Sequence, residues 1–249
     1  MTSSYHILAL ALLFAPRSSA QTPAEDMLLA DDFKAAVAPL EDEANMINDY
    51  EALNKALGRD SIRLCQGYAC TGWMEDKYTD GTLKHRGFYE NGQLLVYKNY
   101  HSNGTLEREF RTVDNFRAVL LTYHPNGTIR TQVKYFKGVA LEWTDHYGNG
   151  QVRYEEEKHK TEPWYLKMNL YQPDGTPIST LMVVDKKKNE VEQKEYWPNG
   201  TVRLSGKARF DPNRQDCVRV GKWTNFDPQG KPTSEEEYVD GRVHATTAL

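Results

Sequence analysis

The sequence predicts a mostly β protein, built as an elongated antiparallel meander of tandem β-hairpins that follows an N-terminal helical cap. Three observations predict this fold. A short Asn-Gly or Asp-Gly element recurs along most of the chain, and the residues between its copies alternate between apolar and polar. The chain is also rich in aromatic residues, which make up 11% of it, and aromatic side chains favour strands.

The recurring element consists of an aromatic residue, one or two spacers, Asn or Asp, Gly, a polar residue and an aliphatic residue. Its Gly residues at 104, 127 and 150 are 23 residues apart, which is enough for two strands and two turns. Asn or Asp before Gly suits a two-residue type I′ turn, because both central residues of that turn need positive φ. We therefore expect type I′ hairpin tips at these pairs. They are Asn91-Gly92, Asn103-Gly104, Asn126-Gly127, Asn149-Gly150, Asp174-Gly175 and Asn199-Gly200.

The residues after each tip alternate with the period of a strand. Ile129, Thr131, Val133 and Tyr135 fall on one side, and the residues between them, Arg130 to Lys134, fall on the other. Alternation of this kind predicts a sheet with one buried face and one face in water.

Residues 21–60 differ from the rest, because they lack Gly before Gly58 and are rich in Ala, Leu, Asp and Glu. Apolar residues from Met46 to Leu57 recur at steps of three and four, which predicts one face of a helix. A second helix is expected over Ala24–Ala38. We expect residues 21–60 to form a helical cap that packs on the first hairpins, and residues 61–249 to form the repeat domain.

Residues 1–20 have the pattern of a secretory signal peptide. The apolar run Ile7–Ala15 is followed by Pro16 and by the small residues 18–20 of a cleavage site. This predicts cleavage at about residue 20 and a secreted or periplasmic protein; the alternative is a buried or disordered N-terminal segment. In an exported chain Cys65 and Cys70 can form a local disulfide, which leaves Cys217 free, or Cys217 pairs with one of them.

No pattern in the sequence predicts catalysis or metal binding. The formal charge is -4 with both signs interspersed, so we expect no nucleic-acid partner. No nucleophile, phosphate-loop or zinc-protease motif occurs, and no Cys or His pair has zinc-finger spacing. We therefore expect no enzyme activity and no cofactor. Trp143, Trp164 and Trp223 are candidate partner-binding aromatics, provided that they share an exposed face.

The repeat resembles a known family. The segments Tyr123–Ile129 and Gly138–Trp143, and above all Gly221-Lys222-Trp223-Thr224-Asn225-Phe226 with its G-x-W-x-x-[YF] pattern, resemble the MORN repeat variant. Bacterial proteins of this type are commonly described as YwqK-family antitoxin-like proteins. The resemblance implies a ribbon of β-hairpins used as a binding or scaffolding surface, with membrane or cell-envelope association as a further implication.

The sequence leaves three functions open. The first is a non-enzymatic exported repeat protein that acts as a protein-binding or scaffolding module. The second is an antitoxin-like protein that neutralises a partner toxin. The third is a protein that binds or cleaves glycan or the cell wall.

Overall fold

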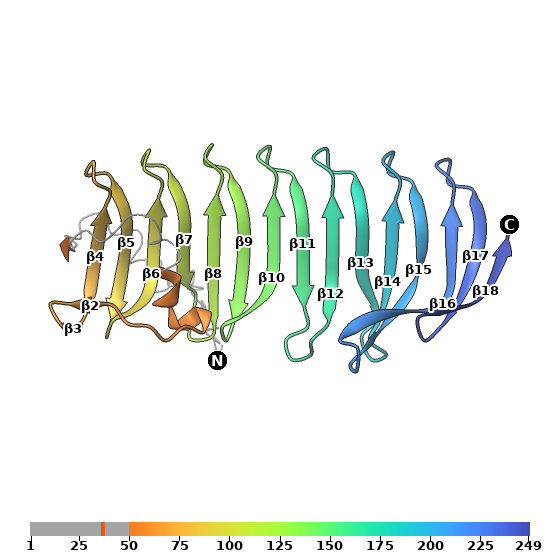
Figure 1. Cartoon of the computed structure of the whole chain (residues 1–249), viewed down its shortest axis with the longest axis horizontal. Coiled ribbons are helices and arrows are strands. Elements are labelled where there is room, and N and C mark those ends of the chain that lie inside the picture. Colours follow the sequence, from red (N-terminus) through yellow and green to blue (C-terminus); the bar gives the residue numbers. More distant parts are fainter. Residues whose placement is uncertain (1–35, 38–49) are drawn as a thin grey trace, which may run out of the picture.

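The computed structural model describes residues 36–37 and 50–249. Fifteen strands, β4 to β18, form one open antiparallel meander in which each strand pairs with the next along the chain (Figure 1). The mostly β fold that the sequence predicts is therefore confirmed.

The strands of the sheet have the following bounds. They are β4 Gly72–Lys77, β5 Leu83–Glu90, β6 Gln93–Tyr100, β7 Leu106–Thr112, β8 Arg117–Tyr123, β9 Ile129–Phe136, β10 Val139–His146, β11 Val152–Lys158, β12 Tyr165–Tyr171, β13 Pro177–Asp185, β14 Glu190–Tyr196, β15 Val202–Asp211, β16 Asp216–Phe226, β17 Pro232–Val239 and β18 Arg242–Ala248. Before the sheet lie β1 Ala36–Val37, the 3₁₀ helix η1 Lys55–Leu57, β2 Leu64–Cys65 and β3 Tyr68–Ala69.

Seven turns of one kind line the upper edge of the sheet in Figure 1, and we call them the tip turns. In each, the N–H of the Gly donates to the carbonyl oxygen of the residue three positions earlier, as Gly127 N–H does to His124 O at 2.8 Å. The N–H of that earlier residue donates to the carbonyl oxygen of the residue that follows the Gly, as His124 N–H does to Thr128 O, also at 2.8 Å. The tip turns span residues 78–82, 101–105, 124–128, 147–151, 172–176, 197–201 and 227–231.

The predicted type I′ geometry is wrong for five of the six Asn-Gly and Asp-Gly pairs. In those five only the Gly has positive φ, so each turn is a three-residue loop closed by a Gly bulge. The Asn or Asp serves by its side chain instead: Asn103 Oδ1 accepts the N–H of Thr105 at 3.0 Å. Asn91-Gly92 alone has positive φ at both residues, 51° and 78°, and it joins β5 to β6 at the opposite edge.

Side chains fasten each tip turn to the next one. Tyr147 Oη donates to Tyr171 O at 2.8 Å, and Asn149 Nδ2 donates to Pro173 O at 2.8 Å. The same two kinds of bond recur along the edge. They join Tyr78 to Tyr100, His124 to His146, Trp197 to Phe226, Asn126 to Gly148 and Asn199 to Pro228. Neighbouring repeats are therefore held together beyond the strand ladder itself.

The two faces of the sheet differ as the alternation predicts. One, the packed face, carries two clusters of buried apolar side chains, centred on Tyr97 and Phe110 and on Leu204 and Trp223. The other carries cross-strand ion pairs, which are Lys134–Glu142, Lys167–Glu155, Lys207–Glu190 and Lys222–Glu235. Ile129 departs from the expected pattern and is 37% exposed, because the register slips between Thr122 and Tyr123.

The predicted helical cap lies mostly outside the described residues. Residues 50–52 are helical and η1 follows, ending at Gly58 with φ 75°. Tyr50 and Leu53 pack on the first hairpins, as expected. Ala36–Val37 forms strand β1, where the sequence predicts a helix, because it pairs in parallel with the outer edge of β4 at Met74 and Glu75. Among the helical residues that the structure describes, none belongs to a helix long and apolar enough to cross a membrane.

The tip turns predict a contrast between two glycines of one turn. Gly150 has φ 86°, whereas Gly148 lies outside the left-handed region, and an added Cβ would meet nothing within 4 Å at either. Gly150→Ala should lower the free energy of unfolding by about 1 kcal/mol, because a Cβ strains that conformation. Gly148→Ala should change it by less than half as much. Urea unfolding of both variants checks this, and equal losses would contradict the turn geometry.

Candidate functional site

The chain between Leu53 and Cys70 is fastened across the β5–β6 turn by backbone hydrogen bonds. Leu94 N–H donates to Leu53 O at 2.9 Å, and Arg63 N–H donates to Gly92 O at 2.8 Å. Gly92 N–H in turn donates to Cys70 O at 2.7 Å. A Cβ on Gly92 would lie 2.8 Å from Ile62 Cβ, so this close crossing requires Gly.

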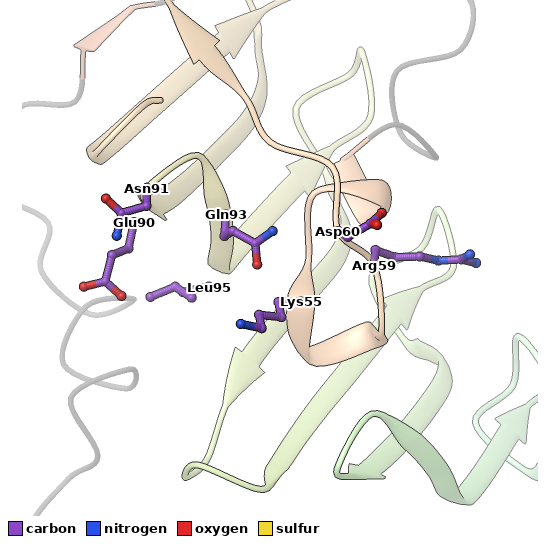
Figure 2. Close-up of a pocket in the computed structure, with 7 residues that line it drawn as sticks. All are labelled: Lys55, Arg59, Asp60, Glu90, Asn91, Gln93 and Leu95. Carbon is purple, nitrogen blue, oxygen red and sulfur yellow. The ribbon is translucent and has the colours of Figure 1, made fainter. Parts of the chain in front are cut away.

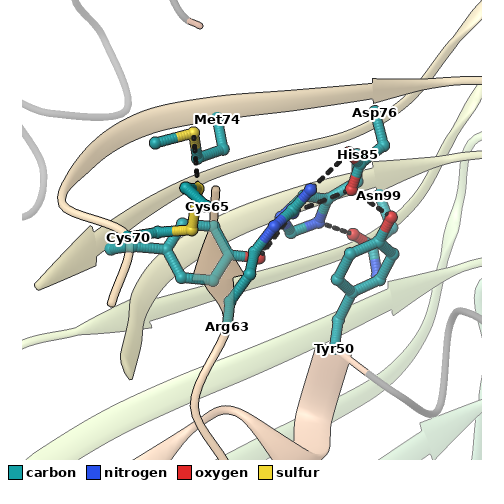
Figure 3. A network of polar contacts seen from close by, with 9 residues as sticks. Tyr50, Arg63, Cys65, Cys70, Met74, Asp76, His85 and Asn99 are labelled. Atoms are coloured by element: carbon teal, nitrogen blue, oxygen red, sulfur yellow. Dashed lines mark hydrogen bonds and ion pairs between the residues drawn. A yellow bond between two sulfur atoms is a disulfide. The ribbon is translucent and has the colours of Figure 1, made fainter. Parts of the chain in front are cut away.

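A buried polar cluster lies where this segment meets the packed face (Figure 3). Asp76 on β4 is 3% exposed. Arg63 donates two hydrogen bonds to its carboxylate, at 2.6 and 2.9 Å, and Tyr50 Oη donates a third at 2.5 Å. The Asp76 carboxylate thus binds both Tyr50, from the helical residues 50–52, and Arg63, from the segment that follows η1.

His85 on β5 extends the cluster into the sheet. Its Nδ1 lies 2.7 Å from Asn99 Oδ1, and its Nε2 lies 3.0 Å from Tyr89 Oη. Because Asn99 presents an oxygen to Nδ1, Nδ1 carries the proton; the Tyr89 hydroxyl, which accepts from Arg63 at 3.2 Å, donates to Nε2. The Tyr50 ring stacks on the imidazole at 3.7 Å between centroids.

Burial and hydrogen bonding set the ionisation of the cluster. Complete burial lowers the pKa of His85 to about 4, which keeps it neutral. Burial alone would raise the pKa of Asp76, but the hydrogen bonds from Arg63 and Tyr50 hold that pKa below its usual range. Burial raises the pKa of Tyr89 to about 12. Each member has at least one hydrogen-bond partner inside the cluster, so the cluster's role is to clamp the cap to the sheet.

A disulfide-closed hairpin stands beside this clamp. Cys65 and Cys70 form a disulfide across β2 and β3, and Cys217 is free. The turn between the two strands, Gln66-Gly67, has φ values of 53° and 85°, as a type I′ turn requires. Figure 1 places this hairpin at the end of the sheet opposite to β18.

The hairpin presents three apolar side chains to solvent. Tyr68 is 81% exposed, Leu64 is 59% exposed, and Ile62, just before β2, is 50% exposed. We call these three residues the hairpin surface. Leu64 and Tyr68 point to opposite faces of the hairpin, because Leu64 pairs with Ala69 and Tyr68 pairs with Cys65. Exposed large apolar side chains on a fixed element commonly mark contact sites for other proteins.

A cavity of about 370 Å³ opens beside the crossing segment (Figure 2). It carries charges of both signs and one apolar side chain. Its lining residues are Lys55, Arg59, Asp60, Glu90, Asn91, Gln93 and Leu95. The cavity lies close to the hairpin surface, because Ile62 packs against the Asn91-Gly92 turn.

The three tryptophans do not form an exposed platform. Trp164 is 2% exposed and Trp223 is 1% exposed, while Trp143 is half-buried and donates from Nε1 to Asp145 at 2.8 Å. Trp223 lies flat on Gly206, where an added Cβ would come within 2.3 Å of its ring, and Arg219 covers it at 4.3 Å. Trp143 and Trp223 lie on the packed face, whereas Trp164 lies in the turn between β11 and β12 and stacks on His159.

Sequence reasoning missed the clamp and the hairpin surface. The clamp residues come from separate segments between Tyr50 and Asn99, so no spacing joins them. For the hairpin surface a signal exists, since Tyr68 lies between two cysteines and is not followed by the Asn-Gly or Asp-Gly pair of a tip aromatic.

Comparison with known proteins supports the repeat at one place. The model of the MORN repeat variant matches residues 219–240, which cover most of β16, the tip turn after it and β17. This stretch is thus a MORN-type repeat, and such repeats are often protein- or membrane-binding modules. No curated protein matches the sequence.

Among solved structures the similarities are weak. A mutant of S. aureus TarM in complex with fondaparinux, alpha-GlcNAc-glycerol and UDP is similar over 62% of this chain, with 10% identity and a TM-score of 0.29; this chain spans 24% of its length. A porin-like protein from Bacteroides uniformis is similar over 69% of this chain and 86% of its own, with 11% identity and a TM-score of 0.24. At these TM-scores neither protein informs the function.

The clamp predicts a specific loss of stability in mild acid. The pKa of His85 is about 4 in the folded protein and near 6.5 when exposed, so the unfolded chain takes up a proton first as pH falls. The free energy of unfolding should fall by about 2 kcal/mol between pH 7.5 and pH 5 on this account. Because the pKa of Asp76 is lowered in the folded protein, protonation of Asp76 reduces the free energy of unfolding further only at still lower pH.

The matched measurement is urea unfolding of His85→Gln at the same two pH values. This variant should lose the larger part of that pH dependence, although its stability at pH 7.5 is lower. An identical pH dependence in both proteins would show that His85 is not buried in the neutral form.

Proposed function

We propose that this protein is an exported, non-enzymatic repeat module that binds another protein through the hairpin surface. The observation that carries this proposal is the exposure of Ile62, Leu64 and Tyr68 on a hairpin closed by a disulfide. The sheet behind it serves as the rigid scaffold.

The fixed conformation of the hairpin supports binding. Arg63 is tied to Gly92 by its backbone and to Asp76 by its side chain, so the residues on either side of it cannot move freely. A partner that meets these side chains does not have to order them, and the entropic cost of association falls accordingly. Tyr is also among the residues that most often dominate binding energy.

The cavity beside the hairpin surface supports selectivity. Lys55 and Arg59 offer positive charge there, and Asp60 and Glu90 offer negative charge. Charges at the rim of an apolar contact select among partners more than they add affinity. We expect the partner to be a protein whose contact surface has apolar side chains flanked by charges of both signs, and we expect no nucleic-acid partner.

Export is supported by the disulfide, since such bonds persist in oxidising compartments. Residues 1–20 lie outside the described residues, and their removal is a direct test. The mature protein isolated from its own cells should begin near residue 21, as read by N-terminal sequencing. An intact first residue would contradict export by this route.

The binding proposal predicts position-specific cross-linking. A photo-reactive phenylalanine analogue in place of Tyr68 should cross-link one protein in a cell-envelope extract. The same analogue at Phe116, which is 56% exposed on another part of the chain, should not. Leu64→Asp should abolish the Tyr68 product. Products at both positions, or at neither, would contradict the proposal.

A toxin encoded nearby as the captured protein would identify the antitoxin function, and capture of cell-wall glycan alone would identify the third function.

The disulfide predicts a linked effect on stability and binding. Replacing both Cys65 and Cys70 by Ser should destabilise the folded chain by about 2 kcal/mol, as expected for a loop of this length. It should also weaken the Tyr68 cross-link, because the hairpin is no longer held in place. Cys217→Ser is the matched control and should leave the cross-link unchanged. Full cross-linking without the disulfide would show that the rigidity of the hairpin is irrelevant.

A further inference from the structure

The two end strands of the sheet are treated differently. The outer edge of β4 pairs with β1 at Met74 and Glu75. β18 pairs with β17 from Arg242 to Ala248, and no strand within the described residues pairs with its other side. An open strand edge presents unpaired backbone donors and acceptors that can bind a further strand.

β18 lacks the features that usually protect such an edge. All seven of its residues are exposed. Its second half, Ala245–Ala248, contains no charge and no Pro, whereas β17 beside it carries Glu235, Glu236 and Glu237. A register shift occurs at His244, near the start of β18, and leaves Ala245–Ala248 regular. Charged residues, Pro and bulges are what keep edges from pairing.

The hydrogen-bond pattern shows which groups face outward. Leu249 N–H donates to Thr233 O at 3.0 Å, toward β17. Direction alternates along an antiparallel strand, so Thr247 and Ala245 also face β17. The N–H and C=O groups of Thr246 and Ala248 therefore face away from the sheet.

We propose that two copies of this chain pair through β18, antiparallel and about a two-fold axis at Thr246. This register sets Thr246 opposite Thr246 of the second copy and Ala248 opposite its His244. The outward backbone groups of Thr246 then pair with those of Thr246 in the second copy. The packed faces of the two copies lie on the same side of one continuous sheet.

Charge favours a second copy as the occupant of this edge. The positive residue of β18, Arg242, lies at its start, so antiparallel pairing places the two copies of Arg242 at opposite ends of the new ladder. No like charges are then directly opposed, and the Thr–Thr pair at the centre is a favourable one. Self-pairing of this kind is the usual form of a symmetric dimer interface.

A groove at the start of β18 fits the end of the second strand. It has a volume of about 500 Å³ and is lined by Arg214, Val239, Asp240, Arg242, Val243 and His244. The proposed register brings Leu249 of the second copy beside Val243. Both residues are more than half exposed in the single chain, so pairing removes apolar surface from water.

The direct test is symmetric disulfide formation in the full chain carrying Cys217→Ser. With Thr246→Cys, the two new thiols face each other across a hydrogen-bonded pair, where the Cα separation of about 5.5 Å permits a disulfide. Mild oxidation should give a covalent dimer. Thr247→Cys is the matched control, because it lies opposite Ala245 of the second copy and on the other face, and it should give no covalent dimer. Covalent dimers from both variants, or from neither, overturn the proposal.

A second measurement needs no new thiol. Sedimentation equilibrium of the unmodified chain should show a monomer–dimer equilibrium. Thr246→Pro removes only an outward N–H, which an edge strand tolerates, and should raise the dimer dissociation constant at least tenfold. Thr246→Val keeps that N–H and should leave the constant within threefold. A monomer at all concentrations, or equal constants for Thr246→Pro and the parent chain, overturns the proposal. The Tyr68 cross-link reports on the other end of the sheet, so the two proposals fail independently.

Discussion

The structure depends on one constraint: a single-layer sheet must bury its apolar face without a second sheet across it. The tip turns are the first part of the answer. Each uses one Gly at positive φ to fix the register of its hairpin, and a slip of one residue would turn every apolar side chain to water. The side-chain bonds between successive tips, such as Tyr147 to Tyr171, then hold neighbouring repeats in place.

The packing of rings flat against glycine backbone is the second way in which the apolar face is buried, and the helical cap is the third. Trp223 lies on Gly206, and the His85 ring lies against Gly87, so large rings cover backbone where a Cβ would collide with them. At the first hairpins the helical segment adds a partial second layer, held by Asp76. The two ends of the sheet consequently differ. One is clamped and carries a closed hairpin, and the other ends in β18, whose outer side has no partner strand among the described residues.

Much of this fold can be predicted from the sequence because the repeat is local. The spacing of Gly residues and the alternation after each tip are sufficient to predict hairpins, their order and the two faces. The turn class was not predictable from Asn-Gly alone, since both a type I′ pair and a Gly-bulge loop accept it. Asn91-Gly92 and Asn103-Gly104 look alike in sequence, yet only the first has Asn at positive φ. The burial of Trp223 depends on Gly206, 17 positions earlier, and the clamp joins residues from five segments.

The central claim is that the hairpin surface is held rigidly against the sheet and is thereby ready to bind. Amide hydrogen exchange of the oxidised protein at neutral pH tests it most directly, at the N–H groups of Arg63, Cys70 and Gly92. Our account predicts that these three amides exchange as slowly as those of β6, because the clamp and the crossing segment open only with the sheet. Exchange at the rate of exposed loops, while β6 stays protected, would contradict it.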